Sequence, residues 1–301
     1  MKQSSTSISD FHDEVQRGER FEFGENWRQF LNGLTDSQVD RATQSVKDLL
    51  QVETLQGKTF LDIGSGSGLF SLAAHRLGAR VTSFDFDPTS VACTQTIKET
   101  YARTSDQWRI MRGSVLDEAF VGTLGQFDIV YSWGVLHHTG AMYKAIDNAM
   151  QRVAPGGLFV IAIYNDQGAW SRRWTKIKKL YCSGPVGKNL VSWIYMPYQV
   201  VRGFAADLVW MRNPIARYRD YSENRGMSVH RDWLDWLGGY PFEYAKPEEI
   251  FQFGRSRGFD LVDLKTAGGS VGCNEFVFRA RLERTLALPA KTSPTDADPV
   301  T

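Results

Sequence analysis

The stretch from Thr59 to Phe70 constrains the fold more than any other part of this 301-residue sequence. It begins with five mostly apolar residues, continues through a loop with glycine at positions 64, 66 and 68, and leads directly into a helical pattern. Because glycine lacks a Cβ atom, such a loop turns tightly and brings backbone N–H groups against a ligand at the positive end of the helix. The pattern predicts the docking site of a nucleotide-like cofactor.

The spacing of the glycines narrows the choice of cofactor. A dinucleotide fingerprint requires a third glycine where this chain has Leu69. A phosphate-binding P-loop requires a Lys-Ser or Lys-Thr pair after the glycines, and none follows here. With these two classes excluded, the spacing favours a cofactor that has no pyrophosphate group.

A second strand pattern ends in an acid about twenty residues after the glycines. It runs from Arg80 to Asp85, and a carboxylate at its end can accept hydrogen bonds from both hydroxyls of a ribose. Asp87 and Pro88 indicate instead an N-cap and a first-turn proline that open a helix through about Thr100.

The run L-D-I-G-S-G-S-G, with Asp85 after the next strand, resembles the class I S-adenosylmethionine-dependent methyltransferases. The resemblance covers residues 55–164 and 246–281. It implies an α/β fold, a doubly wound Rossmann-like sheet of seven strands, with S-adenosyl-L-methionine as cofactor and S-adenosyl-L-homocysteine as product. Residues 225–227 and 235–243, together with Gly272-Cys273-Asn274-Glu275 entering the last strand, are similar to a UbiG-like bacterial branch of that family.

The resemblance also implies a set of cofactor-binding residues, with the loop around Ser114 beside the adenine. Trp27 is added because aromatic segments near the start of such chains often fold over the cofactor; packing on the sheet edge is the equally weighted alternative. The predicted set is Asp62, Gly64, Ser65, Gly66, Gly68, Asp85, Phe86, Ser114, Val115, Trp133 and Trp27.

Paired histidines follow the strand pattern from Gln126 to Trp133. Methyl transfer to a hydroxyl needs a base, and a histidine of ordinary pKa, about 6.5, is mostly neutral at pH 7. We expect His138 to be that base, with His137 as the second candidate, because relatives place the second histidine of such a pair at the substrate side. The alternative is that the pair only caps a helix near Gly140 or packs beneath the loop.

Polar and aromatic residues near the ends of later segments are candidates for binding the methyl acceptor. They are Tyr164, Asn165, Arg225, Tyr240, Glu243 and Asn274. An ordinary turn at positions 238–241 is the structural alternative for part of this set.

An insertion of eighty-one residues, 165–245, separates the fifth core strand from the helix near Pro247. It holds six of the nine tryptophans, and residues 172–219 carry ten Lys and Arg against one acid, Asp207. Pro197, Gly203 and Pro214 predict several short helices that form a lid over the acceptor pocket. A solvated basic face, a membrane surface or lipid-linked acceptor, a homodimer interface and RNA are the other interpretations; with no recognised RNA module, we do not expect nucleic acid.

Composition agrees with a soluble enzyme, since 42% of residues are hydrophobic, 23% are charged and the net charge is only +1. Three separated cysteines without a C-x-x-C pair indicate neither a metal site nor disulfides. With no signal peptide or membrane span recognised, we expect a cytoplasmic protein. The expected parts are a segment over the cofactor (1–54), the core (55–164), the lid (165–245), the completion of the core (246–284) and a flexible tail (285–301).

These features together predict a methyltransferase that methylates a small molecule at oxygen. A sugar, a lipid-linked compound or a thiol is the alternative acceptor. A regulatory protein that binds the cofactor without turnover is the alternative from another class.

Overall fold

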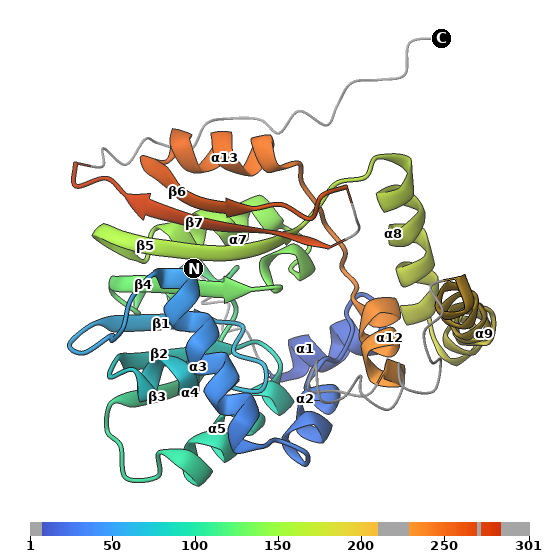
Figure 1. The fold of residues 1–301 in the computed structure, drawn as a ribbon, viewed down its shortest axis with the longest axis horizontal. Helices are drawn as coiled ribbons and strands as arrows, with labels where there is room; N and C mark the ends of the chain where they lie inside the picture. Colours follow the sequence, from blue (N-terminus) through green and yellow to red (C-terminus); the bar gives the residue numbers. More distant parts are fainter. Residues whose placement is uncertain (1–7, 210–228, 270–271, 284–301) are drawn as a thin grey trace.

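A computed structural model describes residues 8–209, 229–269 and 272–283 of the chain. At its centre is one seven-stranded sheet in the order β3-β2-β1-β4-β5-β7-β6, in which β7 runs antiparallel to β5 and β6 (Figure 1). The strands are β1 (Thr59–Ile63), β2 (Arg80–Asp85), β3 (Trp108–Arg112), β4 (Phe127–Trp133), β5 (Val153–Tyr164), β6 (Phe259–Lys265) and β7 (Cys273–Ala280).

Helices cover both faces of this sheet. One face packs against α3 (Asp36–Leu50), α4 (Leu69–Arg76) and α5 (Pro88–Tyr101), and the other against α6 (Glu118–Gly122), α7 (Met142–Met150) and α13 (Pro247–Ser256). Strand β1 shows why its sequence is continuously apolar: Phe60 packs into the first layer, whereas Leu61 and Ile63 pack into the second. A parallel strand buried on both faces is expected to lack alternation.

The doubly wound α/β sheet predicted from the sequence is confirmed. The order of strands reverses between β1 and β4, which pair in parallel. Ligands of open α/β sheets bind in the crevice beyond the carboxyl ends of the strands at such a reversal. The glycine loop follows β1 and the paired histidines follow β4, so the topology brings the two motifs to the same crevice.

Two short helices from the start of the described chain lie at this edge of the sheet. They are α1 (Ile8–Gln16) and α2 (Gly24–Leu31). The backbone N–H of Gly24 donates to the Asp87 carboxylate at 2.7 Å, while the same carboxylate caps α5 through the N–H of Thr89 at 2.8 Å. The predicted cap of α5 is therefore confirmed, and it also fastens α2 to the core.

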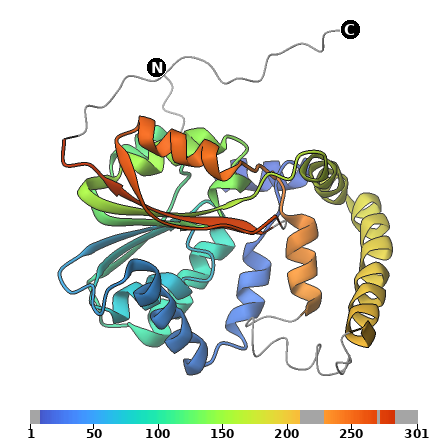
Figure 2. The same ribbon diagram turned by 45° about the horizontal axis from the view of Figure 1, so that its top comes forward.

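The insertion forms α8 (Ala169–Cys182), α9 (Pro185–Val209) and α12 (Val229–Gly238), all beyond the carboxyl ends of the parallel strands (Figures 1 and 2). The prediction that the insertion holds only short helices is wrong for α9, which spans 25 residues with Pro197 inside it. Pro197 removes one helical hydrogen bond. Because this turn is exposed, water can bind the carbonyl group that loses its partner, and the helix continues.

Candidate active site

The loop after β1 is shaped by glycines that accept left-handed backbone angles and close neighbours. Gly66 has a φ of 54°, and a Cβ atom there would lie 2.9 Å from Nε1 of Trp27. A Cβ atom on Gly64 would collide with the side chain of Val135, which precedes the paired histidines. Glycine is thus required for the loop to fit between α2 and the segment after β4.

Asp85 is held against this loop at the end of β2. Its carboxylate accepts hydrogen bonds from the backbone N–H of Gly66 and from that of Asp87, both at 2.9 Å. Burial raises its pKa to about 7 even though these bonds favour the charged form. A carboxylate with few donors in an enclosed site can accept further hydroxyl groups.

Asp62, also in the predicted cofactor set, lies deeper in the core. It accepts a hydrogen bond from the Ser71 hydroxyl at 2.5 Å, and burial raises its pKa to about 6. Ser65, one residue beyond Gly64, pairs its hydroxyl with that of Thr94 at 2.9 Å. These contacts join β1 to α4 and the loop to α5.

The loop predicted beside an adenine follows β3, and Phe86, also in the predicted cofactor set, follows β2. Ser114 uses its hydroxyl to accept from the N–H of Leu116 at 3.2 Å, and Val115 is buried in the core. The ring of Phe86 meets Phe11 edge to face at 5.4 Å, with the Arg20 guanidinium 5.0 Å from its centre. Helix α1 therefore packs over the end of β2.

Trp27 lies over the glycine loop rather than along the sheet edge. Its indole ring also meets Phe30 edge to face at 6.2 Å. Trp133 instead stacks on Tyr131 at 5.9 Å and packs with the apolar layer that contains α3 and α4.

The two histidines occupy a 3-10 turn, Leu136–His138, and they play different structural roles. His137 is fully buried, and its Nδ1 accepts from the backbone N–H of Tyr164 at 3.3 Å. Nδ1 of His138 lies 2.6 Å from the carbonyl oxygen of Pro241. Since a carbonyl only accepts, Nδ1 of His138 must carry the proton, which leaves Nε2 with its lone pair.

The surroundings of His138 keep it neutral. Burial lowers its pKa to about 3, and the nearby cations of Lys178 and Arg20 act in the same direction. The backbone carbonyl of His138 accepts from the Arg20 guanidinium at 3.0 Å. Its ring also packs 5.1 Å from that of Phe23.

An aromatic wall adjoins the histidines; we use this name for Tyr164, Trp236, Phe242 and Trp174. The Tyr164 ring lies 4.1 Å from that of His137, 5.8 Å from Trp236 and 5.0 Å from Phe242. Trp174 of α8 meets Trp236 of α12 at 5.0 Å. The insertion thus contributes three of the four rings at the end of β5.

Lys178 is a buried cation in this wall that the sequence analysis did not single out. Its side chain is fully buried, its Nζ donates to the carbonyl of Trp236, and Nζ lies 4.1 Å from the Trp236 ring centre. A signal did exist, because Lys178 falls at the helical spacing of the buried Ser171 and Tyr181. The basic run around it concealed that position. Arg20 was also missed, since a lone arginine before α2 carries no motif.

Most of the predicted acceptor residues have structural partners. Asn165 and Asn274 pair through their side-chain amides at 3.1 Å and tie β5 to β7. The Glu243 carboxylate accepts from the N–H of Met142 at 3.0 Å and caps α7. The carbonyl of Tyr240 accepts from the N–H of Phe21 at 2.9 Å. Arg225 lies outside the described residues.

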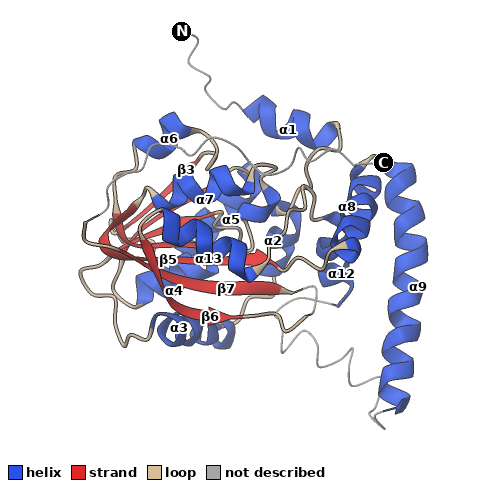
Figure 3. Ribbon diagram, turned by 90° about the horizontal axis from the view of Figure 1, so that it is seen from above, coloured by secondary structure: helices blue, strands red, loops and turns tan. Residues whose placement is uncertain are grey.

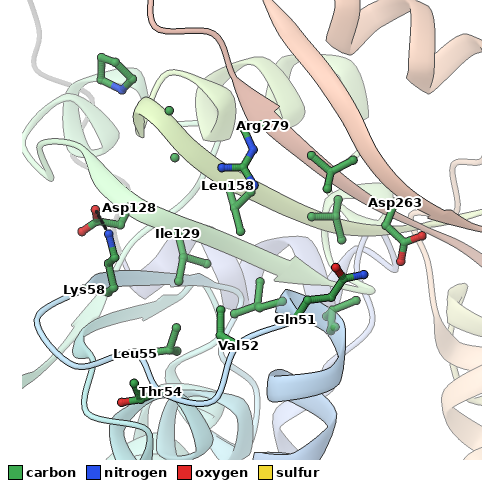
Figure 4. Close-up of a pocket in the computed structure, with 17 residues that line it drawn as sticks. Gln51, Val52, Thr54, Leu55, Lys58, Asp128, Ile129, Leu158, Asp263 and Arg279 are labelled. Atoms are coloured by element: carbon green, nitrogen blue, oxygen red, sulfur yellow. Dashed lines mark hydrogen bonds and ion pairs between the residues drawn. The ribbon is translucent and has the colours of Figure 1, made fainter.

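A cavity of about 440 Å³ lies at the opposite edge of the sheet (Figure 4). Its lining includes Lys58 and Asp128, at the amino ends of β1 and β4, and Arg279 of β7. Ligands of this sheet type bind at the carboxyl edge, so this cavity is separate from the candidate active site. Within the described ranges, no group of three or more His, Cys, Asp or Glu residues is arranged to hold a metal ion.

The comparisons with known proteins agree with this geometry. A family described as "Methyltransferase domain" matches residues 61–159, which run from β1 into β5. The chain contains a class I methyltransferase domain. The ubiquinone biosynthesis O-methyltransferase of Methylobacterium sp. strain 4-46 is 35% identical over 119 residues, covering 40% of this chain and 46% of that protein. The protein of the same name from Paramagnetospirillum magneticum is 32% identical over 128 residues, with 42% and 48% covered.

The alignments thus span about half the length of the curated relatives. Among solved structures, magnesium protoporphyrin IX methyltransferase from Synechocystis PCC 6803 with bound S-adenosylmethionine has a TM-score of 0.52 at 12% identity. That alignment covers 92% of this chain and 100% of the other. At such identity the likeness establishes the fold, and the predicted methyltransferase fold is confirmed.

Proposed function

We propose that this chain binds S-adenosyl-L-methionine at the glycine loop and transfers its methyl group to a small molecule, at an oxygen atom. One observation carries the proposal: a single segment, residues 20–27, touches both halves of the site. Trp27 lies against Gly66, and Phe23 packs 5.1 Å from the His138 ring. The cofactor loop and a base candidate therefore form one site.

The residues present fit this cofactor. Among the described residues, the enclosed Asp85 carboxylate accepts only from backbone N–H groups, so it would hold the two ribose hydroxyls. Ser114, Val115 and Phe86 would flank the adenine, and Trp27 would cover the loop. When bound, the cofactor supplies an electrophilic methyl group.

His138 would act as the base for a hydroxyl acceptor. Its Nδ1 proton is committed to the Pro241 carbonyl, so Nε2 is the atom that takes the acceptor's proton. A group this buried stays neutral across the physiological range, so protonation does not remove the base. Although it is a weak base, it suffices when the acceptor oxygen becomes strongly acidic as its bond to carbon forms. His137 would have a positioning role, because its Nδ1 accepts a hydrogen bond from the backbone N–H of Tyr164.

The aromatic wall would exclude water from the acceptor and pack against a ring. Tyr164 and Tyr240 are the proposed acceptor contacts. Asn165, Asn274 and Glu243 would act mainly by fixing the strand and helix ends that surround them. The curated relatives are named as O-methyltransferases of ubiquinone biosynthesis, which favours oxygen as the acceptor atom. A sugar, a lipid-linked compound or a thiol remains the alternative acceptor, and cofactor binding without turnover the alternative function.

Calorimetry tests cofactor binding, with S-adenosylmethionine titrated into wild type, Asp85→Asn and the exposed-site control Asp106→Asn. We expect binding in wild type and the control and weakened binding in Asp85→Asn. Release of S-adenosylhomocysteine is then measured with a panel of phenols, amines and thiols. Release with phenols alone supports the proposal. Release with amines or thiols alone would show that the acceptor atom is nitrogen or sulfur rather than oxygen. No binding of S-adenosylmethionine by wild type overturns the proposal.

A further inference from the structure

Helix α9 carries a long apolar surface that no described residue covers. Figure 3 shows α9 along the outer flank of the molecule, beyond α8 and α12. Large apolar side chains recur along it at helical spacing and stay exposed: Val186, Leu190, Trp193, Ile194, Tyr198, Val201, Phe204 and Leu208. Trp193 is 82% exposed and Leu208 is 70% exposed. The helix is about 37 Å long at 1.5 Å per residue, so this apolar stripe far exceeds the scattered apolar residues of an ordinary surface.

The exposed charges beside the stripe are all positive, because the one acid of α9, Asp207, is buried. Between residues 167 and 206 the sequence has seven Lys and Arg and no acid. Apart from the buried Lys178, these cations are exposed, at Arg172, Arg173, Lys176, Lys179, Lys188 and Arg202. We call the exposed surface of α8 and α9 the docking face.

We propose that the docking face binds an anionic lipid membrane, with α9 lying in the plane of the headgroups. This inference goes beyond the proposed function, because it concerns where the protein works rather than what it methylates. Interfacial helices combine a continuous apolar face with flanking Lys and Arg, and aromatic rings such as those of Trp193 and Tyr198 favour the headgroup layer. Cations beside that face are attracted to negatively charged lipids.

The charges argue against a second copy of this chain as the occupant. A twofold interface buries the same patch on both subunits, so the basic residues of each copy would face one another. In an antiparallel pair of α9 helices centred near residue 195, Lys188 of one copy would lie opposite Arg202 of the other, and the one acid of the helix, Asp207, is buried. An anionic membrane supplies the missing negative charge.

The helix lies on the surface in this proposal and does not cross the bilayer. Across the described part of the chain, no helix combines enough length and hydropathy for a membrane span. Helix α8 leads from the end of β5 at the candidate active site to α9, so a docked protein would hold that site close to the headgroups.

Vesicle flotation tests the proposal with the full chain. Vesicles of phosphatidylglycerol and phosphatidylcholine in equal parts are compared with vesicles of phosphatidylcholine alone, at low and high salt. We expect wild type to bind the anionic vesicles at least tenfold more tightly and to lose that preference as salt rises. Trp193→Glu should weaken binding at least tenfold.

Leu282→Glu is the matched control, because Leu282 is 79% exposed but lies far along the chain from α9. This variant should bind vesicles like wild type. Light scattering gives the mass of each variant, and S-adenosylmethionine affinity reports whether the core is folded, independently of the docking face. Vesicle binding that survives Trp193→Glu overturns the proposal. So does a wild-type dimer that ignores vesicles and dissociates in Trp193→Glu, which would assign the face to a second copy.

Discussion

Nδ1 of His138 lies 2.6 Å from the carbonyl oxygen of Pro241, which fixes the tautomer of the proposed base. The contact joins the turn after β4 to the end of the insertion, 103 residues later in the chain. It orients the ring and leaves Nε2 as the free basic atom. Neither the paired histidines nor the turn at positions 238–241 predicted this contact from the sequence.

His138→Asn tests whether Nδ1 of His138 positions the side chain while Nε2 acts as the base. The asparagine amide can still donate to the Pro241 carbonyl, but it has no basic nitrogen at the Nε2 position. We expect turnover to fall roughly 100- to 10,000-fold, the range of general base catalysis, while S-adenosylmethionine affinity stays unchanged. Steady-state kinetics and calorimetry measure the two effects; full activity at neutral pH would remove His138 from the chemistry.

The pH profile of turnover gives an independent check on the same residue. Burial lowers the pKa of His138 to about 3, so the ring stays neutral as the pH falls through 6.5. We therefore expect no loss of kcat between pH 8 and pH 5.5 from protonation of a histidine. A drop centred near pH 6.5, absent in His138→Asn, would show that the ring titrates normally.

Asp85→Asn should weaken cofactor binding. The loss of hydrogen bonds to a charged acceptor costs about 1.5–3 kcal/mol, or roughly 10- to 150-fold in dissociation constant. Because the pKa of Asp85 is raised to about 7, wild type should bind S-adenosylmethionine more tightly at pH 8 than at pH 6. Equal affinities at the two pH values, or in the variant, would place the ribose elsewhere.

Asp85 should also make the ligand-free protein less stable as the pH rises. Its folded pKa of about 7 exceeds the ordinary 3.8, so the folded state holds a proton that the unfolded chain has released between these values. Its stabilising contribution is full below about pH 4 and is lost as pH rises through 7. Urea unfolding at pH 5 and pH 8 should show this decline in wild type and a smaller one in Asp85→Asn; an identical decline in both would assign it to other groups.

Gly66→Ala should disrupt the site more than a glycine substitution elsewhere. Both Gly66 and Gly125 have positive φ, where a Cβ atom costs about 1–2 kcal/mol, but only at Gly66 would that atom meet Trp27. Gly125→Ala, with nothing within 4 Å, is the control for backbone strain. We expect both variants to unfold more easily and Gly66→Ala alone to lose cofactor affinity, measured by thermal unfolding and calorimetry.

Glu243→Ala distinguishes a helix cap from an acceptor contact. Its carboxylate caps α7 at Met142, and loss of a cap costs about 1 kcal/mol. The variant should lose stability in urea unfolding and keep the KM for the acceptor. A raised KM with unchanged stability would return Glu243 to the binding residues.

The sequence predicted the core of this protein well because local rules and topology agreed there. The strand before Gly64, the acid at Asp85 and the cap at Asp87 are short-range patterns, and each lies where the pattern indicated. The parallel sheet then dictated that the ends of β1 and β4 meet. Such features need no information about distant contacts.

The insertion was predicted less well because its structure depends on long-range packing. Pro197 was expected to end a helix, but exposure lets α9 continue through it. Lys178 was hidden in a basic run, although its position on the buried side of α8 sets it beside Trp236. Side chains such as Asn165 and Asn274, which lie 109 residues apart, form a pair that no local pattern indicates.

The most direct test of the central claim is turnover with natural acceptors. Purified wild type and His138→Asn are incubated with S-adenosylmethionine and a cell extract separated into small-molecule and lipid fractions, and S-adenosylhomocysteine release and methylated products are measured. The account predicts release by wild type, a product carrying the methyl group on oxygen, and a large loss in His138→Asn. Confirmed cofactor binding without release from any fraction, or equal release by both proteins, would contradict it.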